Sequence, residues 1–332
     1  MKIIVDAFGG DNAPLEIIKG CVDAVNEFDD LSIILTGDEA IIKRVMSENN
    51  LSDNRIEIYH CTEVITMEDP ADAVLKTKKD SSMAVGFKLL NEEAGDAFVS
   101  AGNSGALCVG ATLAVKRIKG IKRPAFSPVL PSDNGCFIVM DAGANVDCRP
   151  EMLYQFAVMG SIYMNKVMKV ENPRIGLLNV GSEEGKGTEL YKTTYNMLKE
   201  SNLNFIGNIE GRDVPEGKCD VVVCDGFAGN VFIKTYEGVA LLIMDKIKSI
   251  FTSSLKNKLA AGLVLSDINK LKKELDYNEY GGAAIIGASR PVFKAHGSSK
   301  ARTIKSAIRI CRDYVSADAI SEISKAIQEK SV

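Results

Sequence analysis

Short apolar runs alternate along this chain with longer segments in which apolar residues recur at helical spacing. The runs are rich in Val, Ile and Phe and are bounded by Gly, Asn and Asp, which is typical of buried strands. We predict strands at residues 2–5, 31–36, 55–59, 97–100, 174–179, 204–207 and 221–224.

Helical segments separate these strands. A first helix opens at Asn12-Ala-Pro-Leu, where a capping residue precedes a proline in the first turn. Helical spacing also marks residues 70–90, a long helix from 229 to about 250 and a last helix from 298 to near 330. Two apolar runs, 125–130 and 136–140, are joined by a turn at 131–135 and predict a hairpin.

The alternation of strands and helices predicts an α/β fold, with helices on both faces of a largely parallel sheet. The hairpin makes the sheet mixed. No low-complexity linker interrupts the chain, so we expect a single domain over residues 1–332, which can consist of two intimate lobes.

Five of the predicted strands are followed by a polar loop that contains glycine. The loops are 6–11 (DAFGGD), 100–105 (SAGNSG), 141–147 (DAGANVD), 179–187 (NVGSEEGKG) and 225–230 (DGFAGN). In open α/β sheets, ligands bind where the carboxyl ends of strands meet helix N-termini, and glycine lets backbone N–H groups approach an anion. The five loops together predict one crevice for a phosphate-like ligand, with Gly9, Gly10, Gly105, Gly187 and Gly229 in contact with it.

Composition narrows the function classes. The net charge of −4 argues against general nucleic-acid binding, and eight scattered cysteines with only two histidines argue against a structural zinc site. Asp6 interrupts the first apolar run, so we expect no signal peptide, and no apolar stretch reaches the length of a membrane span. We therefore expect a cytoplasmic protein with reduced thiols.

Candidate catalytic groups lie in the loops. Lys186 stands between two glycines and is a good partner for phosphate or an oxyanion, although a solvated lysine is the alternative. Asn103 and Ser104 begin a helix and can donate to an anion, or they can simply cap it. Ser104 is a doubtful nucleophile because no histidine lies near it in sequence.

The remaining loops offer carboxylates, amides and the two histidines. Asp225 and Asn230 are followed one turn later by Lys234. Asp141, Asn145 and Asp147 suit Mg²⁺, but turn capping is the more frequent use of such residues, and we expect no metal. His296 precedes the last helix and is a catalytic candidate, whereas His60 is expected to be structural.

Residues 251–265 (FTSSLKNKLAAGLVL) form a short basic amphipathic segment that we expect to protrude between two helices. Leu255, Leu259 and Leu263 lie at four-residue spacing, with Lys256 and Lys258 among them. Such a segment can rest on an anionic membrane, or it can pack on its own protein or on a dimer partner.

Taken in order, these loops closely resemble the bacterial phosphate acyltransferase (PlsX) family of phospholipid synthesis, over essentially the whole chain. The resemblance lies in DAFGGDNAP at 6–14, SAGNSGAL at 100–107, RPA at 123–125, DAGANVDC at 141–148, LLNVGSEEGKG at 177–187, VCDGFAGNVFIKTYEG at 223–238, YGGAAIIG at 280–287 and KAHGSS at 294–299. Phe8, where the family usually has Met, and the AAIIG block, where it usually has proline and leucine, are apolar departures.

The resemblance implies transfer of a long fatty acyl chain from acyl carrier protein to inorganic phosphate, without a cofactor. It also implies a three-layer α/β/α sandwich like that of phosphotransacetylases and of isocitrate and isopropylmalate dehydrogenases, working as a homodimer. The family is cytoplasmic with peripheral membrane association, and it delivers acyl phosphate to a membrane glycerol-phosphate acyltransferase.

On this basis Lys186 and Asn230 are expected to contact phosphate and the oxyanion, and Asn103 and Ser104 to cradle phosphate. His296 would protonate the thiolate or orient phosphate, Asp225 would position Lys186 or Lys234, and Gly187 and Asn145 would complete the site. An acidic carrier also requires a basic docking patch, for which the candidates are Lys76, Lys78, Lys79, Lys116, Arg117, Lys119, Lys122 and Arg123.

Other functions fit parts of the same pattern. A phosphotransacetylase that acts on short acyl-CoA shares the fold and the chemistry, and a 2-hydroxy-acid dehydrogenase shares the fold but lacks a nicotinamide fingerprint here. A non-catalytic scaffold that brings carrier protein to membranes is a third alternative. A cysteine-based acyl-enzyme, through Cys108, Cys148 or Cys224, is a mechanistic alternative.

Overall fold

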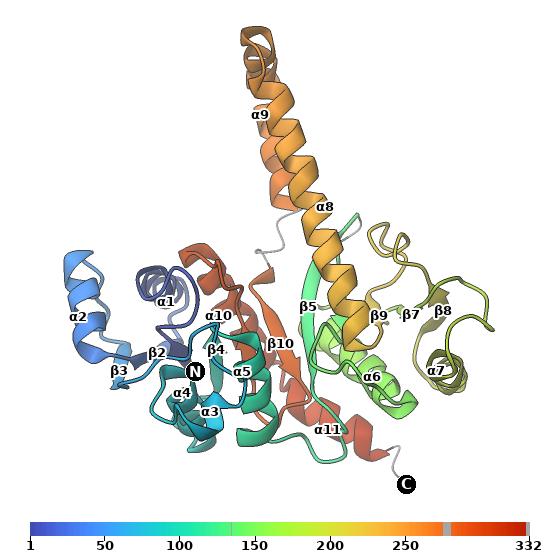
Figure 1. Ribbon diagram of the computed structural model, residues 1–332, viewed down its shortest axis with the longest axis horizontal. Helices are drawn as coiled ribbons and strands as arrows, with labels where there is room; N and C mark the ends of the chain where they lie inside the picture. Colours follow the sequence, from blue (N-terminus) through green and yellow to red (C-terminus); the bar gives the residue numbers. More distant parts are fainter. Residues whose placement is uncertain (134, 275–279, 330–332) are drawn as a thin grey trace.

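The computed structural model describes residues 1–133, 135–274 and 280–329. Within these residues, eleven strands form one continuous sheet in the order β3-β2-β1-β4-β11-β10-β5-β6-β9-β7-β8 (Figure 1). The strands are β1 (Lys2–Asp6), β2 (Ser32–Gly37), β3 (Ile56–His60), β4 (Ala97–Ser100), β5 (Ala125–Ser132), β6 (Gly135–Met140), β7 (Ile175–Leu178), β8 (Phe205–Ile209), β9 (Val221–Val223), β10 (Ala283–Ile286) and β11 (Val292–Lys294).

The sheet consists of two parallel blocks that run in opposite directions. Strands β3, β2, β1, β4 and β11 are parallel to one another, and so are β6, β9, β7 and β8. Between the blocks, β10 is antiparallel to both β11 and β5, and β5 is antiparallel to β6. The expected mixed, largely parallel sheet and the 125–140 hairpin are confirmed.

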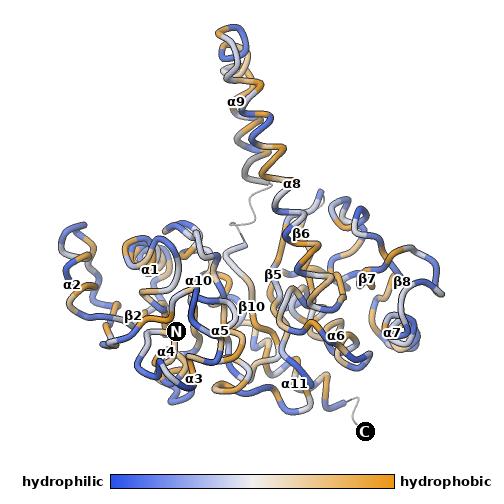
Figure 2. Tube along the Cα trace, in the orientation of Figure 1, coloured by the Kyte–Doolittle hydropathy of each residue, from blue (hydrophilic) through white to orange (hydrophobic). Residues whose placement is uncertain are grey.

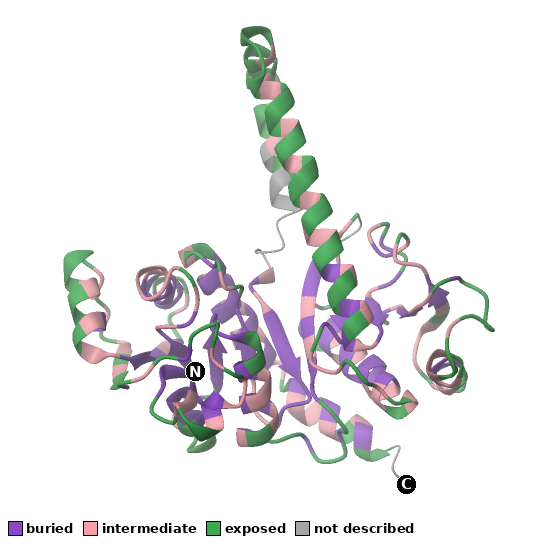
Figure 3. Cartoon of the chain, viewed as in Figure 1, coloured by how far each residue is buried: buried purple, intermediate pink, exposed green. Residues whose placement is uncertain are grey.

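Helices cover both faces of the sheet and give the three-layer sandwich. One face packs against α1 (Leu15–Glu27), α6 (Pro150–Lys166), α7 (Glu189–Lys199), α10 (Ala301–Ser316) and α11 (Ala319–Glu329). The other packs against α4 (Ser82–Asn91), α5 (Ser104–Val109), its π-helical continuation η1 (Gly110–Ala114) and the start of α8 (Gly226–Thr252). Central strands such as β1, β4, β9 and β10 are buried on both faces (Figure 3), which explains why their sequences are continuous apolar runs, whereas the edge strand β3 is partly exposed.

The structure corrects several predicted boundaries. Strands β10 and β11 were not predicted. The 70–90 segment divides into α3 (Ala73–Lys76) and α4, and Ser81 begins the second helix by accepting a hydrogen bond from the backbone N–H of Ala84. The last predicted helix divides into α10 and α11, because Asp318 adopts a left-handed conformation with φ of 48°.

Helix α2 (Glu39–Glu48) follows β2. The Nδ1 atom of His60 accepts a hydrogen bond from the N–H of Glu39, which gives His60 its expected structural role.

Helices α8 and α9 (Leu255–Glu274) form a hairpin that projects from the body (Figure 1). Only the beginning of α8 packs on the sheet: Ile233 is buried, and the hydroxyl of Tyr236 donates to the carbonyl of Pro131. Beyond that point apolar and polar residues mix along both helices (Figure 2), and most of the described residues are exposed while the others are half-buried (Figure 3). By length and composition α8 is apolar enough to cross a membrane, with 11% of its apolar window buried.

The start of α8 packs so closely on the 141–145 loop that only glycine fits. A Cβ added to Gly229 would lie 1.9 Å from the carbonyl oxygen of Asp141, which is backbone and cannot move aside. We predict that Gly229→Ala lowers the free energy of unfolding by about 3 kcal/mol, because overpacking forces the backbone apart.

Gly238 in the same helix is the matched control. Nothing lies within 4 Å of a Cβ added there, so Gly238→Ala should raise stability by about 0.5–1 kcal/mol through helix propensity. Denaturant unfolding of both variants measures this difference, and equal stability of the two would contradict the close packing.

Candidate active site

A pocket of about 620 Å³ lies on the α5 and α8 side of the sheet, where the two parallel blocks meet. Four of the five predicted loops supply lining residues, and the 294–298 segment after β11 supplies more. The 179–187 loop supplies none of them. Its strand, β7, is separated from β6 by β9, which places this loop away from the junction of the blocks.

Direct contacts hold the loops of the first block together. The hydroxyl of Ser100 donates to Oδ2 of Asp6 over 2.7 Å, and the N–H of Asp11 donates to the carbonyl of Gly297 over 2.8 Å. Asp6 is buried, and this desolvation raises the pKa of its carboxyl group. Gly9 lies against the backbone N–H of Gly102, where a Cβ would be only 2.6 Å away.

The loop of the second block is built around Asp141. Its Oδ1 atom accepts N–H groups of Phe126 and Ala142, both at 2.7 Å, and its Oδ2 atom accepts the N–H of Asn145 at 2.6 Å. The interpretation of Asp141 as a turn-capping residue is therefore confirmed. The carbonyl of Asn145 in turn accepts the N–H of Gly226 at 2.7 Å, which fixes the start of α8.

Lys294 is a pocket residue to which the sequence analysis gave no role. It ends β11 with only 6% of its surface exposed, and its ammonium donates to the carbonyls of Ala101 (3.1 Å) and Ala295 (2.5 Å). An ammonium has three N–H donors, so one remains for a ligand in the pocket that Lys294 lines. Desolvation lowers its pKa to about 8, and the nearby Cys108, Asp6 and Asp11 partly oppose this shift.

His296 lies two residues after Lys294 and lines the same pocket. The backbone N–H of Ser298 donates to its Nδ1 atom over 3.3 Å, and the Ser298 hydroxyl lies 2.8 Å from the same atom. With Nδ1 accepting, the neutral ring carries its proton on Nε2. Burial lowers the pKa of His296, which favours this neutral form.

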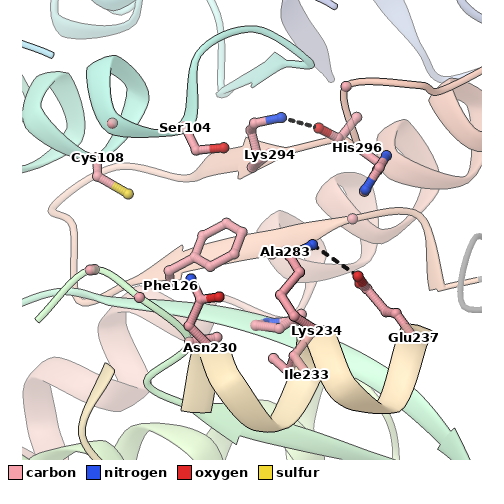
Figure 4. Close-up of a pocket in the computed structure, with 18 of the residues that line it drawn as sticks. Ser104, Cys108, Phe126, Asn230, Ile233, Lys234, Glu237, Ala283, Lys294 and His296 are labelled. Atoms are coloured by element: carbon pink, nitrogen blue, oxygen red, sulfur yellow. Dashed lines mark hydrogen bonds and ion pairs between the residues drawn. The ribbon is translucent and has the colours of Figure 1, made fainter. Parts of the chain in front are cut away.

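Ser104 and Asn230 face each other across the pocket (Figure 4). Ser104 begins α5 and lies beside Lys294, whereas Asn230 projects from the first turn of α8. Both line the pocket, as does Gly105. Lys234 and Glu237 lie one turn further along α8 and pair with each other over 2.8 Å.

The side chains of Asn103 and Asn145 are used inside the protein. Oδ1 of Asn103 accepts the N–H of Ala106, which confirms the helix cap, and its Nδ2 donates to the carbonyl of Thr66. Nδ2 of Asn145 donates to the carbonyl of Pro124 over 2.8 Å. Both amides shape the loops around the pocket, and their contact with substrate stays a prediction.

The expected pairing of Asp225 with Lys186 or Lys234 is wrong. Asp225 caps α8 by accepting the N–H of Ala228 at 2.9 Å, and it accepts the hydroxyl of Tyr191 at 2.6 Å. Lys186 instead lies 3.7 Å from Glu183 with half of its side chain exposed.

Lys186 and Gly187 are not among the residues that line the pocket. Gly187 has φ of 87° and packs against Asn179. Gly10 (φ of 96°) and Gly229, in contrast, lie against backbone atoms, so these two glycines allow close chain crossing. Lys186 therefore stays a prediction that depends on approach of its loop to the bound substrate.

Cys108 is the one cysteine among the lining residues of the pocket, and its environment suppresses ionisation. Burial raises the pKa of its thiol to about 12, and burial likewise raises those of Cys148 and Cys224. A thiol needs to be a thiolate to act as a nucleophile. The burial of Cys108, Cys148 and Cys224 thus disfavours the cysteine-based acyl-enzyme.

The lining of the pocket is partly apolar. Phe126, Leu130 and Ile233 line it, and the polar side chains of Asn230, Lys234 and Glu237 lie beside Ile233 on α8 (Figure 4). Ser104, Lys294 and His296 lie across the pocket from them (Figure 4). The arrangement suits a ligand with an anionic or carbonyl head and an apolar tail.

Comparisons with known proteins agree with this arrangement. The family model described as "Fatty acid synthesis protein" matches residues 1–322. A phosphate acyltransferase of Acetivibrio thermocellus is 50% identical over 97% of this chain and 95% of its own length. One of Thermoanaerobacter pseudethanolicus is 45% identical over 99% of this chain and 98% of its own length.

Solved structures share the fold at low sequence identity. A phosphotransacetylase of Streptococcus pyogenes superposes with a TM-score of 0.64 at 16% identity, covering 97% of this chain and 94% of that one. The phosphotransacetylase EutD of Staphylococcus aureus gives a TM-score of 0.60 at 15% identity over 95% and 94% of the two chains. The expected phosphotransacetylase-like α/β fold is thereby confirmed.

The charge of Lys294 gives a testable dependence on pH. We predict that Lys294→Met lowers kcat/KM for phosphate by roughly 100- to 1,000-fold, as loss of one preorganised donor does. In the wild-type protein kcat/KM should fall as pH rises through about 8, because the ammonium loses its proton there. In Lys294→Arg this alkaline fall should disappear, since a guanidinium does not titrate in this range.

The pH dependence of folding stability has the opposite sign to that of kcat/KM and serves as the control. Because burial lowers the pKa of Lys294 from 10.5 to about 8, the unfolded chain binds more protons between these values and this contribution to stability rises with pH. Thermal unfolding at each pH separates the two effects. An alkaline fall that persists unchanged in Lys294→Arg would rule out this role.

Proposed function

The chain belongs to the fatty acid synthesis protein family and is a phosphate acyltransferase, and we propose that its acyl donor is a long-chain acyl thioester of acyl carrier protein. The acyl phosphate product would serve phospholipid synthesis. The observation that carries this proposal is a pocket that combines apolar lining residues, among them Phe126, Leu130 and Ile233, with the donors Lys294, His296 and Ser104.

The proposed reaction needs no covalent intermediate with the protein. An oxygen of HPO₄²⁻ forms a bond to the thioester carbonyl carbon, the C–S bond breaks, and the phosphate proton ends on the sulfur. Charge and atoms balance, since the dianion and the thioester become an acyl phosphate dianion and a thiol. Holding the two reactants side by side supplies much of the rate enhancement.

The pocket residues fit these needs. The third N–H of Lys294 and the hydroxyl of Ser104 would bind phosphate, whose charge offsets the cost of burying an ammonium. The amide of Asn230, on the opposite wall, would donate to the carbonyl oxygen as it gains negative charge. Lys186 would join from its neighbouring loop.

His296 would assist the departing sulfur. Its Nε2–H would donate a hydrogen bond to the thiolate, while Nδ1 accepts from Ser298. The proton that ends on the sulfur would come from hydrogen phosphate, because a neutral imidazole is a far weaker acid than a thiol. This role uses the neutral ring that burial favours.

The alternative donor is a short acyl-CoA, and it remains an alternative because the solved structures with the same fold are phosphotransacetylases. The apolar lining residues Phe126, Leu130 and Ile233 favour a longer chain here. The dehydrogenase and the non-catalytic scaffold have no comparable support, since the curated relatives are phosphate acyltransferases.

We further propose that the α8–α9 hairpin serves assembly and membrane contact in a cytoplasmic homodimer. Val239, Leu242 and Ile243 are at least 48% exposed on α8, a surface suited to a second copy of this chain. Leu255, Leu259 and Leu263 near the tip are 71–87% exposed and share one helix face with lysines beside them, which suits an anionic membrane. Acyl phosphate would then pass to a membrane glycerol-phosphate acyltransferase.

We expect purified protein to release free carrier protein from palmitoyl-acyl carrier protein only when phosphate is added. Acyl phosphate, trapped with hydroxylamine, should form in equal amount, and turnover should persist in EDTA. Acetyl-CoA in place of the carrier thioester is the control. Strong activity with acetyl-CoA and none with the carrier thioester would favour the short-chain alternative, and no turnover with any donor would favour the scaffold.

The hairpin tip gives a separate prediction. Replacing Leu255, Leu259 and Leu263 with Glu should abolish sedimentation with vesicles that contain anionic lipid, because a charged face cannot enter the interface. Turnover in solution should stay within about twofold of wild type, as none of these residues lines the pocket and their helix, α9, projects from the body (Figure 1). Unchanged sedimentation would show that other residues mediate any membrane contact.

A further inference from the structure

A second pocket of about 620 Å³ lies next to the active-site pocket and is predominantly basic. Arg117, Lys122, Arg123 and Arg149 line it, and Asp147 is the one acidic lining residue. The whole chain carries a net charge of −4, so this pocket stands out against an acidic background. A local excess of cations on an acidic protein attracts an acidic partner.

The two arginines at the rim are available for a partner. In the described part of the chain, the side chains of Arg123 and Arg149 have neither a hydrogen bond nor an ion pair, and both residues are exposed. Many other cations of the chain are in ion pairs, such as Arg174 with Asp220 and Arg312 with Asp30.

The frame that carries these cations is fixed by hydrogen bonds. The amide of Gln155 accepts the N–H of Lys122 at 2.8 Å and donates to the carbonyl of Gly120 at 2.9 Å. Asn145 donates to the carbonyl of Pro124, the residue after Arg123, over 2.8 Å. The guanidinium of Arg117 donates to the carbonyl of Lys122. A fixed frame lowers the entropy lost when a partner binds.

Two segments connect this pocket to the active site. Val109 lines the active-site pocket and Leu113 the basic one, and they lie about 6 Å apart along the same helical segment. Likewise Ala144 lines the first pocket and Asp147 the second, on a single loop. A partner bound at the basic pocket would thus lie beside the active-site pocket.

Exposed apolar residues show which class of ligand the surface suits. Leu113 and Val146 are each 62% exposed next to the cations. A free anion would use the charges alone, whereas protein interfaces combine apolar contacts with a charged rim.

We propose that this basic pocket, defined by Arg117, Lys122, Arg123 and Arg149, docks the acidic face of the carrier protein and presents its thioester to the active site. The proposal rests on the proposed function. It also narrows the sequence-based candidates: Lys76 pairs with Asp72 and Lys78 with Asp69, while Arg149 was not among them. Lys79, Lys116 and Lys119 do not line the pocket.

The test compares Arg123→Glu/Arg149→Glu with a matched pair, Arg44→Glu/Lys192→Glu, whose exposed cations lie on α2 and α7 at the two ends of the sheet (Figure 1). The expected result is a rise of at least tenfold in KM for palmitoyl-acyl carrier protein in the pocket variant alone. Turnover with palmitoyl-N-acetylcysteamine, a thioester without a carrier, should be unchanged in both variants. Added salt should raise the wild-type KM for the carrier thioester more than that of the pocket variant.

The outcomes separate this proposal from the proposed function. If wild-type protein turns over the carrier thioester and the pocket variant has the same KM, the docking site is overturned while the function stands. If wild-type protein accepts no carrier thioester, the proposed donor fails first. If the pocket variant instead loses binding to anionic vesicles and keeps its KM, the pocket is a membrane contact and the docking proposal is overturned.

Discussion

The buried carboxylate of Asp141 is the interaction on which the arrangement of this protein depends. It stands where β6 ends, at the junction of the two opposed halves of the sheet, and it accepts hydrogen bonds from Phe126, Ala142 and Asn145. Through these contacts one side chain ties the start of β5, the 141–145 loop and, by way of the Asn145 carbonyl, the first turn of α8. Both pockets and the direction of the hairpin follow from this junction.

Burying a charged carboxylate costs free energy, because the group loses its hydration, and the hydrogen bonds to Asp141 offset this cost. Burial raises the pKa of Asp141, and the N–H donors of Phe126, Ala144 and Asn145 oppose the rise by stabilising the charged form. Lys294 meets the same cost on the other side of the pocket with two carbonyl acceptors. A dianionic substrate is well matched to such an ammonium, because it supplies the countercharge that carbonyl groups only partly replace.

The sequence predicted the sheet, the hairpin and most loops because these depend on local pattern. Apolar runs and glycine-bearing loops follow from what neighbouring residues need, and four of the five loops do line one pocket. It could not reveal β10 and β11, since apolar runs as short as AAII and VF have no distinct period. Lys294 was missed for a related reason. Its burial depends on β11, and without a predicted strand there, a lysine is expected to be exposed to solvent.

The assignment of individual roles failed where pairing is long-range. Asp225 was expected to hold a lysine, but Tyr191, 34 residues away, supplies its partner. Asn103 and Asn145, which resemble ligand-binding amides in sequence, donate to backbone carbonyls, and their contact with substrate stays a prediction. A polar residue after a strand therefore predicts where a site lies better than it predicts what touches the ligand.

The distribution of surface chemistry around the junction gives the proposed function a direction. Basic residues gather around one pocket beside the active site. Exposed leucines gather near the tip of the α8–α9 hairpin, whose first helix carries Asn230 near its start. Under the proposed function, a water-soluble acidic carrier would arrive at the first surface and the apolar product would leave toward the second. Because α8 contributes to the pocket and then extends into the hairpin, the same helix that holds the reacting carbonyl would also set the distance between the active site and the membrane.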